Sequence, residues 1–398
     1  MATNNTPKYS LFELTKYFFY LGYAGFGGPV ALVGYMHRDL VEKRGWISED
    51  DYKEGMALAQ LSPGPMAAQL GIYLGYVHYG ILGATLTGLA FVIPSFFMVL
   101  ILGIAYKAYG GLAWMQAVFY GVSAAVIGII AMSIYKLTVK SISQLEWQAV
   151  KKHRILWFLY AIGLVFTLLT QREDVLVFLA AGVIYMFIKA PPTWIKNKKT
   201  VGIFLFFPTL FWTTDSKTLW NIAVFFIKAG AFVFGSGLAI IPFLHGGVVQ
   251  EFGWLTEKEF VDAVAVAMIT PGPVVITVGF IGYLVGGISG ACVAALATFL
   301  PCYLLTVLPA PYFKKIAKNM SIKAFVDGIT AAVVGALVGA VCIIAYRTFV
   351  DANHHVDYIA ILLALISGVI LWNFKKIQEP HIILMSAIIG FILKTYVV

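Results

Sequence analysis

The sequence contains little formal charge. Only 12% of its 398 residues are charged, whereas 60% are hydrophobic and 15% are aromatic. A soluble domain carries about 25% charged residues, so this chain lacks the polar side chains that would cover a soluble fold of its length. The alternative solvent is lipid, in which an apolar exterior is favourable. The composition therefore excludes an ordinary soluble protein.

Two long runs contain no Lys, Arg, Asp or Glu at all. They extend from Gly55 to Tyr106 and from Ala263 to Phe313. Each run is long enough for two membrane-spanning helices of ~20 residues. Neither run alternates polar and apolar residues with a period of two, as a membrane-spanning β-strand would. We therefore predict an all-α polytopic membrane protein that is in contact with the lipid bilayer.

Cysteine is scarce, and the common catalytic motifs are missing. Cys292, Cys302 and Cys342 lie in apolar stretches, form no CxxC motif and lack histidines at metal-ligand spacing, so we interpret them as buried small hydrophobes. The chain has no P-loop, no G-x-S-x-G and no H-E-x-x-H. These absences predict that the protein is not an enzyme and binds neither a metal nor a cofactor.

The charge that is present is mainly positive. The formal net charge is +9, but no basic segment interleaved with aromatic residues accompanies it. Nucleic acid is therefore not an expected partner. An excess of Lys and Arg in loops that face the cytoplasm explains the same balance.

The chain is internally duplicated. Residues Phe26 to Gly71 align without a gap onto Phe234 to Gly279, and fourteen of the 46 positions are identical. After a one-residue deletion the match resumes with Gly80/Gly287, Gly83-Ala84/Gly290-Ala291 and Pro94/Pro301. We infer two homologous helical halves, 1–200 and 218–398, joined by an apolar connecting segment at 201–217.

Hydropathy places six membrane spans in each half. In the first half they are expected at 11–36, 55–78, 81–106, 112–135, 155–171 and 174–190. In the second half they are expected at 218–244, 263–285, 288–313, 324–346, 357–374 and 379–397.

The positions of the basic residues favour inverted halves. The loop after the fourth span is rich in Lys and Arg in the first half, whereas its counterpart holds only Arg347. The loop before the fourth span shows the reverse, with Lys107 alone in the first half and four lysines in the second. If both rich loops are cytoplasmic, Val201 to Thr214 forms a further crossing and the halves are inverted repeats with about 12–13 membrane segments.

Gly and Pro interrupt the first two spans of each half at matched places. The first break carries Gly25-Phe26-Gly27-Gly28-Pro29 and, in the second half, Phe234-Gly235-Ser236-Gly237. The second break carries Ser62-Pro63-Gly64-Pro65 and Thr270-Pro271-Gly272-Pro273. Such breaks are tolerated only where the backbone is buried in protein or lines a wet cavity. A kink that merely improves helix packing is the alternative.

The second break predicts a helix that begins inside the membrane. Ser62 and Thr270 are suited to cap that helix, and Pro63 and Pro271 to its first turn. A helix N-terminus offers free N–H groups and the positive end of a dipole, so it can hold an anion without a formal charge. Broken spans at matched positions in two halves point to the binding site of a transporter.

Polar side chains close to the breaks are further candidates for substrate contact. Gln60 and Gln69 flank the first Pro-Gly-Pro, and hydrogen bonding between helices is their alternative role. Lys228 lies inside a predicted span, where its long stem could also snorkel to the interface. The substrate-binding candidates are Gly27, Gly28, Pro29, Gln60, Ser62, Pro63, Gly64, Pro65, Gln69, Lys228, Gly235, Ser236, Gly237, Thr270, Pro271, Gly272 and Pro273.

Titratable residues near the ends of these spans are candidates for proton coupling. His37 and His245 occupy the same repeat position, and an interfacial histidine with a local partner is the alternative. Glu54 and Asp262 form a second matched pair, whose alternative role is that of first-turn acids on helix dipoles. The proton-coupling candidates are His37, Arg38, Glu54, His245 and Asp262.

These motifs resemble the chromate ion transporter family, in its two-domain type. The likeness rests on Gly25 to Pro29, His37-Arg38, Gly45-Trp46 and Gln60 to Pro65, and on their counterparts in the second half. It covers roughly residues 11–107 and 220–313. The sequence departs from the family pattern in its second half, where Ser236 replaces the usual Gly and Met268 replaces Gln in many members.

The resemblance implies a transporter of the prokaryotic inner (plasma) membrane. It implies export of chromate, with sulfate as the natural analogue and protons as the coupling ion. Together with the broken spans, it predicts a secondary active transporter that works by alternating access around a midplane anion site. A passive anion channel with the same filter is the alternative, and a homodimer is left open.

Overall fold

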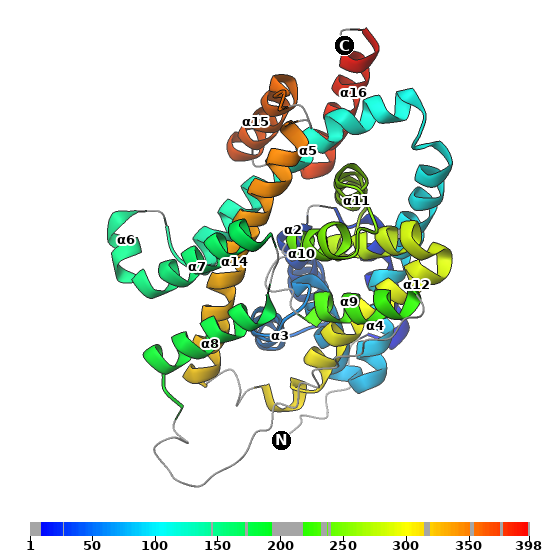
Figure 1. The fold of residues 1–398 in the computed structure, drawn as a ribbon. Coiled ribbons are helices and arrows are strands. Elements are labelled where there is room, and N and C mark those ends of the chain that lie inside the picture. Colours follow the sequence, from blue (N-terminus) through cyan, green and yellow to red (C-terminus); the bar gives the residue numbers. More distant parts are fainter. Residues whose placement is uncertain are drawn as a thin grey trace.

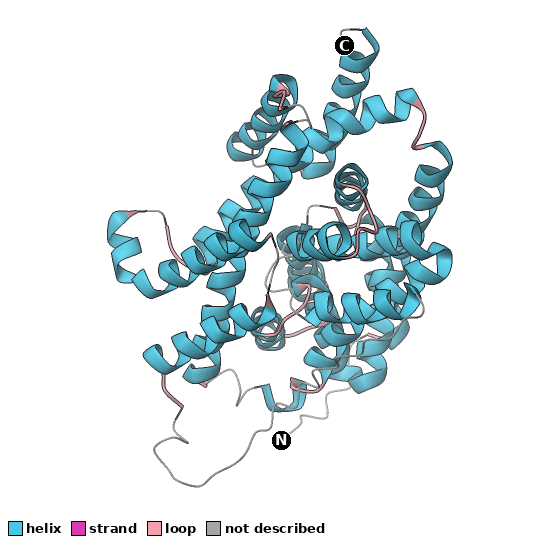
Figure 2. Ribbon diagram, viewed as in Figure 1, coloured by secondary structure: helices cyan, strands magenta, loops and turns pink. Residues whose placement is uncertain are grey.

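The computed structural model describes residues 9–26, 28–144, 146–171, 174–192, 218–231, 237, 240–313, 319–350, 354–374 and 377–396. The predicted crossing at Val201 to Thr214, within the connecting segment 201–217, lies outside these residues. The described chain folds into helices, as predicted (Figures 1 and 2). The helices of the first half are α1 Leu11–Ala24, α2 Gly28–Met36, η1 His37–Lys43, α3 Glu49–Leu61, α4 Met66–Tyr109, α5 Ala113–Ser141, α6 Trp147–Lys152, α7 Arg154–Thr170 and α8 Val175–Lys189. Those of the second half are α9 Thr218–Ala231, α10 Ile240–His245, η4 Gly246–Glu251, α11 Glu257–Ile269, η5 Val274–Ile276, α12 Thr277–Val307, η6 Ala310–Tyr312, α14 Met320–Phe349, α15 Tyr358–Asn373 and α16 Glu379–Tyr396.

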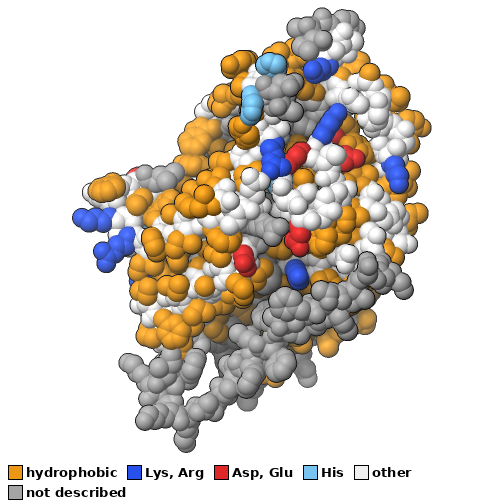
Figure 3. Space-filling model, viewed as in Figure 1, with side chains coloured by type: hydrophobic (Ala, Val, Ile, Leu, Met, Phe, Trp, Pro, Cys, Tyr) orange, Lys and Arg blue, Asp and Glu red, His pale blue; other side chains and the backbone are white. Residues whose placement is uncertain are grey.

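Several of these helices suit a membrane. Among the described residues, four helical stretches are long and apolar enough to cross one by themselves, namely Met66–Tyr109, Ala113–Ser141, Val274–Tyr312 and Met320–Phe349. Many large hydrophobic side chains lie exposed on the outside, and hydrophobic side chains dominate the face in Figure 3. An exterior of this kind is favourable only against lipid.

The first two predicted spans of the first half are each divided in two. The span expected at 11–36 consists of α1 and α2, which are separated at Gly25 and Phe26. The span expected at 55–78 consists of α3, which already begins at Glu49, and the first part of α4. With 14, 9 and 13 residues, α1, α2 and α3 are each shorter than the ~20 residues that cross a bilayer.

The long helices α4 and α12 each fold back on themselves. Gly80 and Gly287 have φ of 58° and 62° inside these helices. A Cβ on Gly83 would lie 2.1 Å from the carbonyl oxygen of Gly75, although residues eight positions apart in a straight helix are about 12 Å apart. Each helix is therefore a tight hairpin, which joins the second predicted span to the third.

The backbone repeats the internal duplication of the sequence. Positive φ occurs at three matched pairs of glycines, Gly45/Gly253, Gly64/Gly272 and Gly80/Gly287. The π-helical segments η1 and η4 also occupy matched positions, each of them after the helix that follows the first break. The two halves therefore share local geometry as well as residue type.

The last three long helices of each half pack crosswise. α5 of the first half packs against α15 and α16 of the second, and α14 of the second half packs against α7 and α8 of the first (Figure 1). Matched glycines permit the close approach, because a Cβ on Gly128 would meet Ala364 of α15 and one on Gly335 would meet Tyr160 of α7. The halves defined by sequence are thus not separate bodies.

The cysteines are only partly as expected. All three are free, but Cys302 alone is buried, whereas Cys292 is half-buried and Cys342 is exposed on α14. The prediction that all three are buried small hydrophobes is therefore wrong for Cys342. An exposed apolar residue on a membrane helix costs little, since it faces lipid.

Candidate functional site

The broken segments of the two halves meet in space. The Gly272 N–H, in the second Pro-Gly-Pro, donates a hydrogen bond of 2.9 Å to the carbonyl of Gly25, between α1 and α2. Gly272 has φ of 94°, and a Cβ there would lie 2.0 Å from the Ser95 Oγ. Ser95 in turn donates to the Gly22 carbonyl at 2.9 Å. The first break of one half and the second break of the other therefore form a single structural unit.

A cavity of about 900 Å³ lies against this unit, and we call it the first cavity. Residues from three of the interruptions line it, including Gly25, Phe26, Met66 and Val274. Five of the predicted substrate-binding residues line it as well, namely Gly28, Pro29, Gln60, Thr270 and Gly272. Gly25 and Gly272, which are 247 positions apart in the chain, thus share one cavity.

Three helices begin at the first cavity. α2 begins at Gly28, α4 at Met66 and η5, which leads into α12, at Val274, and all three residues line the cavity. The first N–H groups of a helix have no intrahelical acceptor, and they carry the positive end of its dipole. The N–H groups at these helix starts are therefore candidate donors to an anion.

The predicted caps of these helices are wrong. Ser62 and Thr270 are the C-caps of α3 and α11, and the N-cap position of α4 is occupied by Pro65. The Thr270 hydroxyl donates back to the carbonyl of Val266, one turn earlier. The error arises because Pro63 and Pro271 end the preceding helix, so that the next one begins three or more residues later.

Basic and hydroxyl side chains from α5 complete the first cavity. Lys136, Lys140, Ser133 and Ser141 line it together with Asp327 and Thr330 of α14. Sequence reasoning missed this group, because it ended the fourth span at residue 135 and assigned both lysines to a loop. The α5 helix instead continues to Ser141. Lys136 and Lys140 are exposed and line the same cavity as the three helix starts.

The other polar residues of the Pro-Gly-Pro loops support the backbone. The Gln69 Nε2 donates to the Pro63 carbonyl at 2.8 Å, and the side chain packs beneath Gly64. Its counterpart Thr277 likewise donates to a loop carbonyl, that of Val274, at 2.7 Å. Neither Gln69 nor Thr277 is among the residues that line the first cavity.

The remaining substrate-binding candidates lie elsewhere. Gly27, Gly235 and Ser236 fall outside the residues that the structure describes. Lys228 is exposed on α9 and does not belong to the lining of either described cavity. Ser62, Pro63, Gly64, Pro65, Gly237, Pro271 and Pro273 lie in or near the loops but do not line the first cavity.

The two matched histidines each bind a matched glutamate. The His37 Nε2 lies 2.9 Å from a Glu49 carboxylate oxygen, and the His245 Nε2 lies 2.6 Å from Glu257. The surroundings of the two pairs differ. The His37 side chain is 30% exposed, whereas that of His245 is 3% exposed. Arg38, next to His37, forms an ion pair with Asp39.

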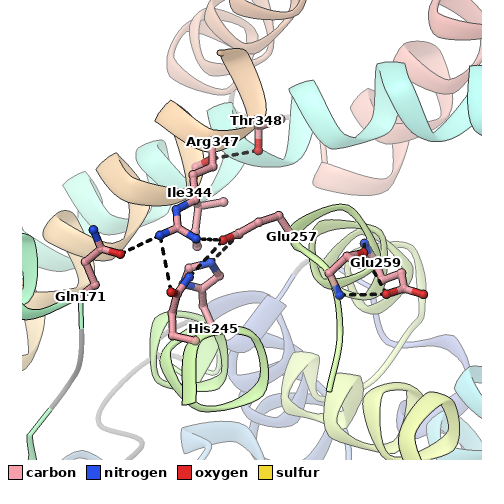
Figure 4. Close-up of polar contacts among 9 residues, drawn as sticks. Gln171, His245, Glu257, Glu259, Ile344, Arg347 and Thr348 are labelled. Atoms are coloured by element: carbon pink, nitrogen blue, oxygen red, sulfur yellow. Dashed lines mark hydrogen bonds and ion pairs between the residues drawn. The ribbon is translucent and has the colours of Figure 1, made fainter. Parts of the chain in front are cut away.

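An ion-pair network surrounds Glu257 (Figure 4). Arg347, near the C-terminus of α14, donates one hydrogen bond to Glu257 and another to Gln171 at 2.6 Å. Gln250 also donates to Glu257, at 3.1 Å. Burial alone would raise the pKa of Glu257, but His245 and Arg347 outweigh that effect and lower the pKa below its usual value. Glu257 is therefore an ionised carboxylate at neutral pH.

Asp262 is a buried acid within α11. Its carboxylate accepts hydrogen bonds from Tyr106 at 2.8 Å and Ser123 at 3.1 Å, both of which come from the first half. The side chain is 1% exposed, and the residue lies in the second turn of α11, so the first-turn alternative is wrong for it. Its counterpart Glu54 lies half-buried in α3 beside Tyr73.

A second cavity of about 610 Å³ lies at the other end of α11. Its basic residues are Lys258, Arg347 and Lys394, and Glu257, which is paired with Arg347, also lines it. Tyr120, Ser123 and Thr348 also line it. The helix α11 thus runs from the second cavity at Glu257 to the first cavity at Met268.

Comparison with known proteins identifies the family. The sequence profile of the family described as "Chromate transporter" matches residues 12–187 and 220–391. The chain belongs to the chromate transporter family. It is therefore a multi-pass membrane transporter and not an enzyme, and the two matched segments correspond to the two halves predicted from the sequence.

Individual relatives agree with this assignment. A "Chromate transport protein" of Cupriavidus metallidurans is 59% identical over 98% of this chain and 95% of its own length. A "Probable chromate transport protein" of Synechococcus elongatus is 56% identical over 97% of this chain and 96% of its own. An "Uncharacterized transporter" of Bacillus subtilis is 27% identical over 46% of this chain but 90% of its own length, so it corresponds to about one half. No solved structure matches.

Proposed function

We propose that this protein is a secondary active transporter that exports chromate across the plasma membrane. The observation that carries the proposal is the first cavity, at which three helix N-termini and two lysines converge without a metal-binding cluster among the described residues. The two relatives that are more than half identical over nearly the whole chain are named as chromate transport proteins, and their names support the choice of substrate.

Chromate suits this cavity in charge and shape. It is a tetrahedral dianion, and backbone N–H groups, hydroxyls and lysine ammonium groups are donors that hold such an anion reversibly. Sulfate has the same charge and a similar geometry, so it is the expected competitor. The donors that we assign to the ion are the N–H groups at the start of α2 and η5, together with Gln60 and Lys140.

The arrangement of helices supports inverted halves. The N-terminal part of α5 shares the second cavity with the C-terminal part of α14, whereas the C-terminal part of α5 shares the first cavity with the N-terminal part of α14. The two helices therefore run antiparallel, although they occupy equivalent positions in the repeat. Equivalent helices run antiparallel when the repeats are inverted and parallel when they are not.

Separate cavities favour alternating access over a permanently open channel. Along α5 and α11, Ala125, Val126, Val264 and Ala265 lie between the residues that line the two cavities, and all four are buried in one hydrophobic core. We propose protons as the coupling ion and Asp262 as the residue that carries them, since it is a buried acid bound to hydroxyl groups between these cavities.

Flux in liposomes tests the proposal. The purified protein is reconstituted, and chromate and sulfate movement is measured with and without a pH gradient. Uphill chromate movement driven by the gradient is the expected result, and Asp262→Asn should uncouple it. Flux that only dissipates gradients would instead identify a passive channel, and no flux of any tetrahedral oxyanion would exclude the function.

A further inference from the structure

The internal repeat continues into the helices that line the cavities. The residues from Gly121 to Gly128 read GVSAAVIG in α5, and those from Gly328 to Gly335 read GITAAVVG in α14. Gly121 and Gly328 are separated by the same number of residues as Gly80 and Gly287, so the alignment continues without a further gap. Every residue of α5 therefore has a counterpart in α14. This correspondence allows the two cavities to be compared residue by residue.

The two cavities are related by the repeat. Lys140 and Ser141 of the first cavity correspond to Arg347 and Thr348 of the second. In the opposite direction, Tyr120 and Ser123 of the second cavity correspond to Asp327 and Thr330 of the first. Along α5 and α14, each cavity is thus lined by the counterparts of residues that line the other, as antiparallel equivalent helices require, whereas Gln60 and its counterpart Met268 both line the first cavity.

The two cavities nevertheless differ in one charge pair. Arg347 is paired with Glu257 at the second cavity, and the adjoining His245 is buried. Among the residues that the structure describes, its counterpart Lys140 forms no ion pair, and Glu49, the counterpart of Glu257, instead contacts His37 and Lys53. The first cavity reaches the broken segments, whereas the second does not.

We propose that the two cavities are the alternating mouths of one oxyanion pathway and that these charge pairs close them in turn. In the present conformation Glu257 and Arg347 close the second mouth. In the opposite conformation Glu49 and Lys140 close the first mouth, and Arg347, Lys258 and Lys394 then receive a tetrahedral oxyanion. This inference deepens the proposed transport function and rests on it.

The location of the network supports a closing role. Arg347 lies on α14, whereas Glu257 begins α11 and His245 ends α10, so the pair ties the broken helices of the second half to the crosswise-packed helices (Figure 4). On the face drawn in Figure 3, basic and acidic side chains interrupt a largely hydrophobic surface. An ion pair in such a place holds two elements together until one of its charges is removed or finds another partner.

Thiol labelling tests the proposal. Cys292, Cys302 and Cys342 are first replaced by serine, and chromate flux is measured to check that this cysteine-free protein is active. Single cysteines are then introduced as Ser141→Cys and Thr348→Cys, and a membrane-impermeant thiol reagent is applied to each side of oriented vesicles. We expect the two positions to react from opposite sides, with position 141 reacting faster.

Two matched variants should change the labelling rates at positions 141 and 348 in opposite directions. Glu257→Gln should raise the rate at position 348 and lower it at position 141, by about fivefold or more, because a lost charge-assisted hydrogen bond shifts a two-state equilibrium by such a factor. Glu49→Gln should do the reverse. Glu251→Gln, which removes a charge next to the network, should change neither rate.

Labelling of both positions from the same side would overturn the proposal, as would variants at Glu257 and Glu49 that move the rates in the same direction or not at all. Flux distinguishes this failure from a failure of the proposed function. If the protein transports chromate but positions 141 and 348 are both labelled from the same side, the proposed function stands and the alternating mouths are excluded. If the two positions are labelled as predicted but no oxyanion is transported, the proposed function is excluded.

Discussion

At the scale of the single residue, Gly272 is constrained by its backbone conformation, by a hydrogen bond and by its packing. It has a left-handed backbone, it donates to Gly25 across the two halves, and a side chain would collide with Ser95. A left-handed conformation alone costs an L-residue roughly 1–2 kcal/mol. This glycine is therefore required by both its conformation and its close packing.

Gly272→Ala should reduce chromate flux to background while Gly253→Ala retains most of it. Both glycines have positive φ, at 94° and 57°, but nothing lies within 4 Å of a Cβ at Gly253. The comparison separates backbone strain, which both variants share, from the collision in the cavity wall. Flux in liposomes and thermal stability in detergent measure the two effects, and equal losses in both variants would contradict the role of the close contact.

Lys140 is the second informative residue, because it is a charge at the first cavity. Lys140→Gln should raise the apparent KM for chromate roughly two- to fivefold, as expected for an exposed charge worth up to about 1 kcal/mol. The effect should shrink at high ionic strength. Lys140→Arg should behave like the wild type, and Lys151→Gln on α6 is the control. A changed kcat with an unchanged KM would argue against substrate attraction.

At the scale of the element, the network at the start of α11 predicts a pH dependence. The pKa of Glu257 is lower in the folded protein than in the unfolded chain. Its contribution to stability is therefore fully present above the unfolded pKa of about 4.3 and is lost as the pH falls below that value. Glu257→Gln should lower thermal stability at pH 7 and flatten its decline in acid. An unchanged acid profile in this variant would exclude Glu257 as a contributor.

The crosswise packing of α14 against α7 depends on small residues. Gly335→Ala should destabilise the protein by about 1–3 kcal/mol, which is typical of overpacking, because its Cβ would lie 1.9 Å from the Tyr160 carbonyl. Gly34→Ala is the matched control on α2, where a Cβ has nothing within 4 Å and alanine favours the helix. Thermal unfolding in detergent measures both, and a stable Gly335→Ala would contradict the packing argument.

At the scale of the whole molecule, the two halves are intertwined. Because α7 and α8 bury their small-residue faces on α14, and α15 and α16 do so on α5, each half covers part of the other. Duplication in one chain places both partners in the same molecule.

This arrangement predicts that a fragment of residues 1–200 is not a stable monomer. Expressed alone, it should dimerise or aggregate, since α7 and α8 would expose the surface that α14 covers. Expressed together with a fragment of residues 218–398, it should form a complex that recovers flux. Size-exclusion chromatography in detergent measures the outcome, and a monodisperse, thermally stable monomer would contradict the crosswise packing.

Part of the candidate site could be predicted from the repeat, because that part depends on backbone geometry. The matched Gly and Pro breaks predict Gly28, Pro29, Thr270 and Gly272, and Gln60 is predicted as a polar neighbour of the first Pro-Gly-Pro. All five residues line the first cavity. Gly and Pro restrict or free the backbone at their own positions, so a sequence reveals where helices end. It does not show which distant residues pack against those ends.

Other features could not be predicted, for reasons of side-chain reach and long-range contact. Lys140 reads as a loop residue at the end of a span, and only the length of α5 brings it to the cavity. The pairing of Arg347 with Glu257 joins residues that are 90 positions apart, and neither residue alone predicts it. The repeat of Gly121 to Gly128 in Gly328 to Gly335 was a signal that could have extended the duplication to these helices.

The sequence by itself determined that lipid surrounds the protein, that the fold is helical, that the chain is duplicated and where its helices break. It could do so because scarcity of charge, apolar runs and Gly-Pro motifs act locally, on the residues that carry them. The tertiary structure decided which breaks meet, which half covers which, and how the few charges are shared between two cavities. Those properties depend on contacts between distant residues, whose free energy exists only once the chain has folded.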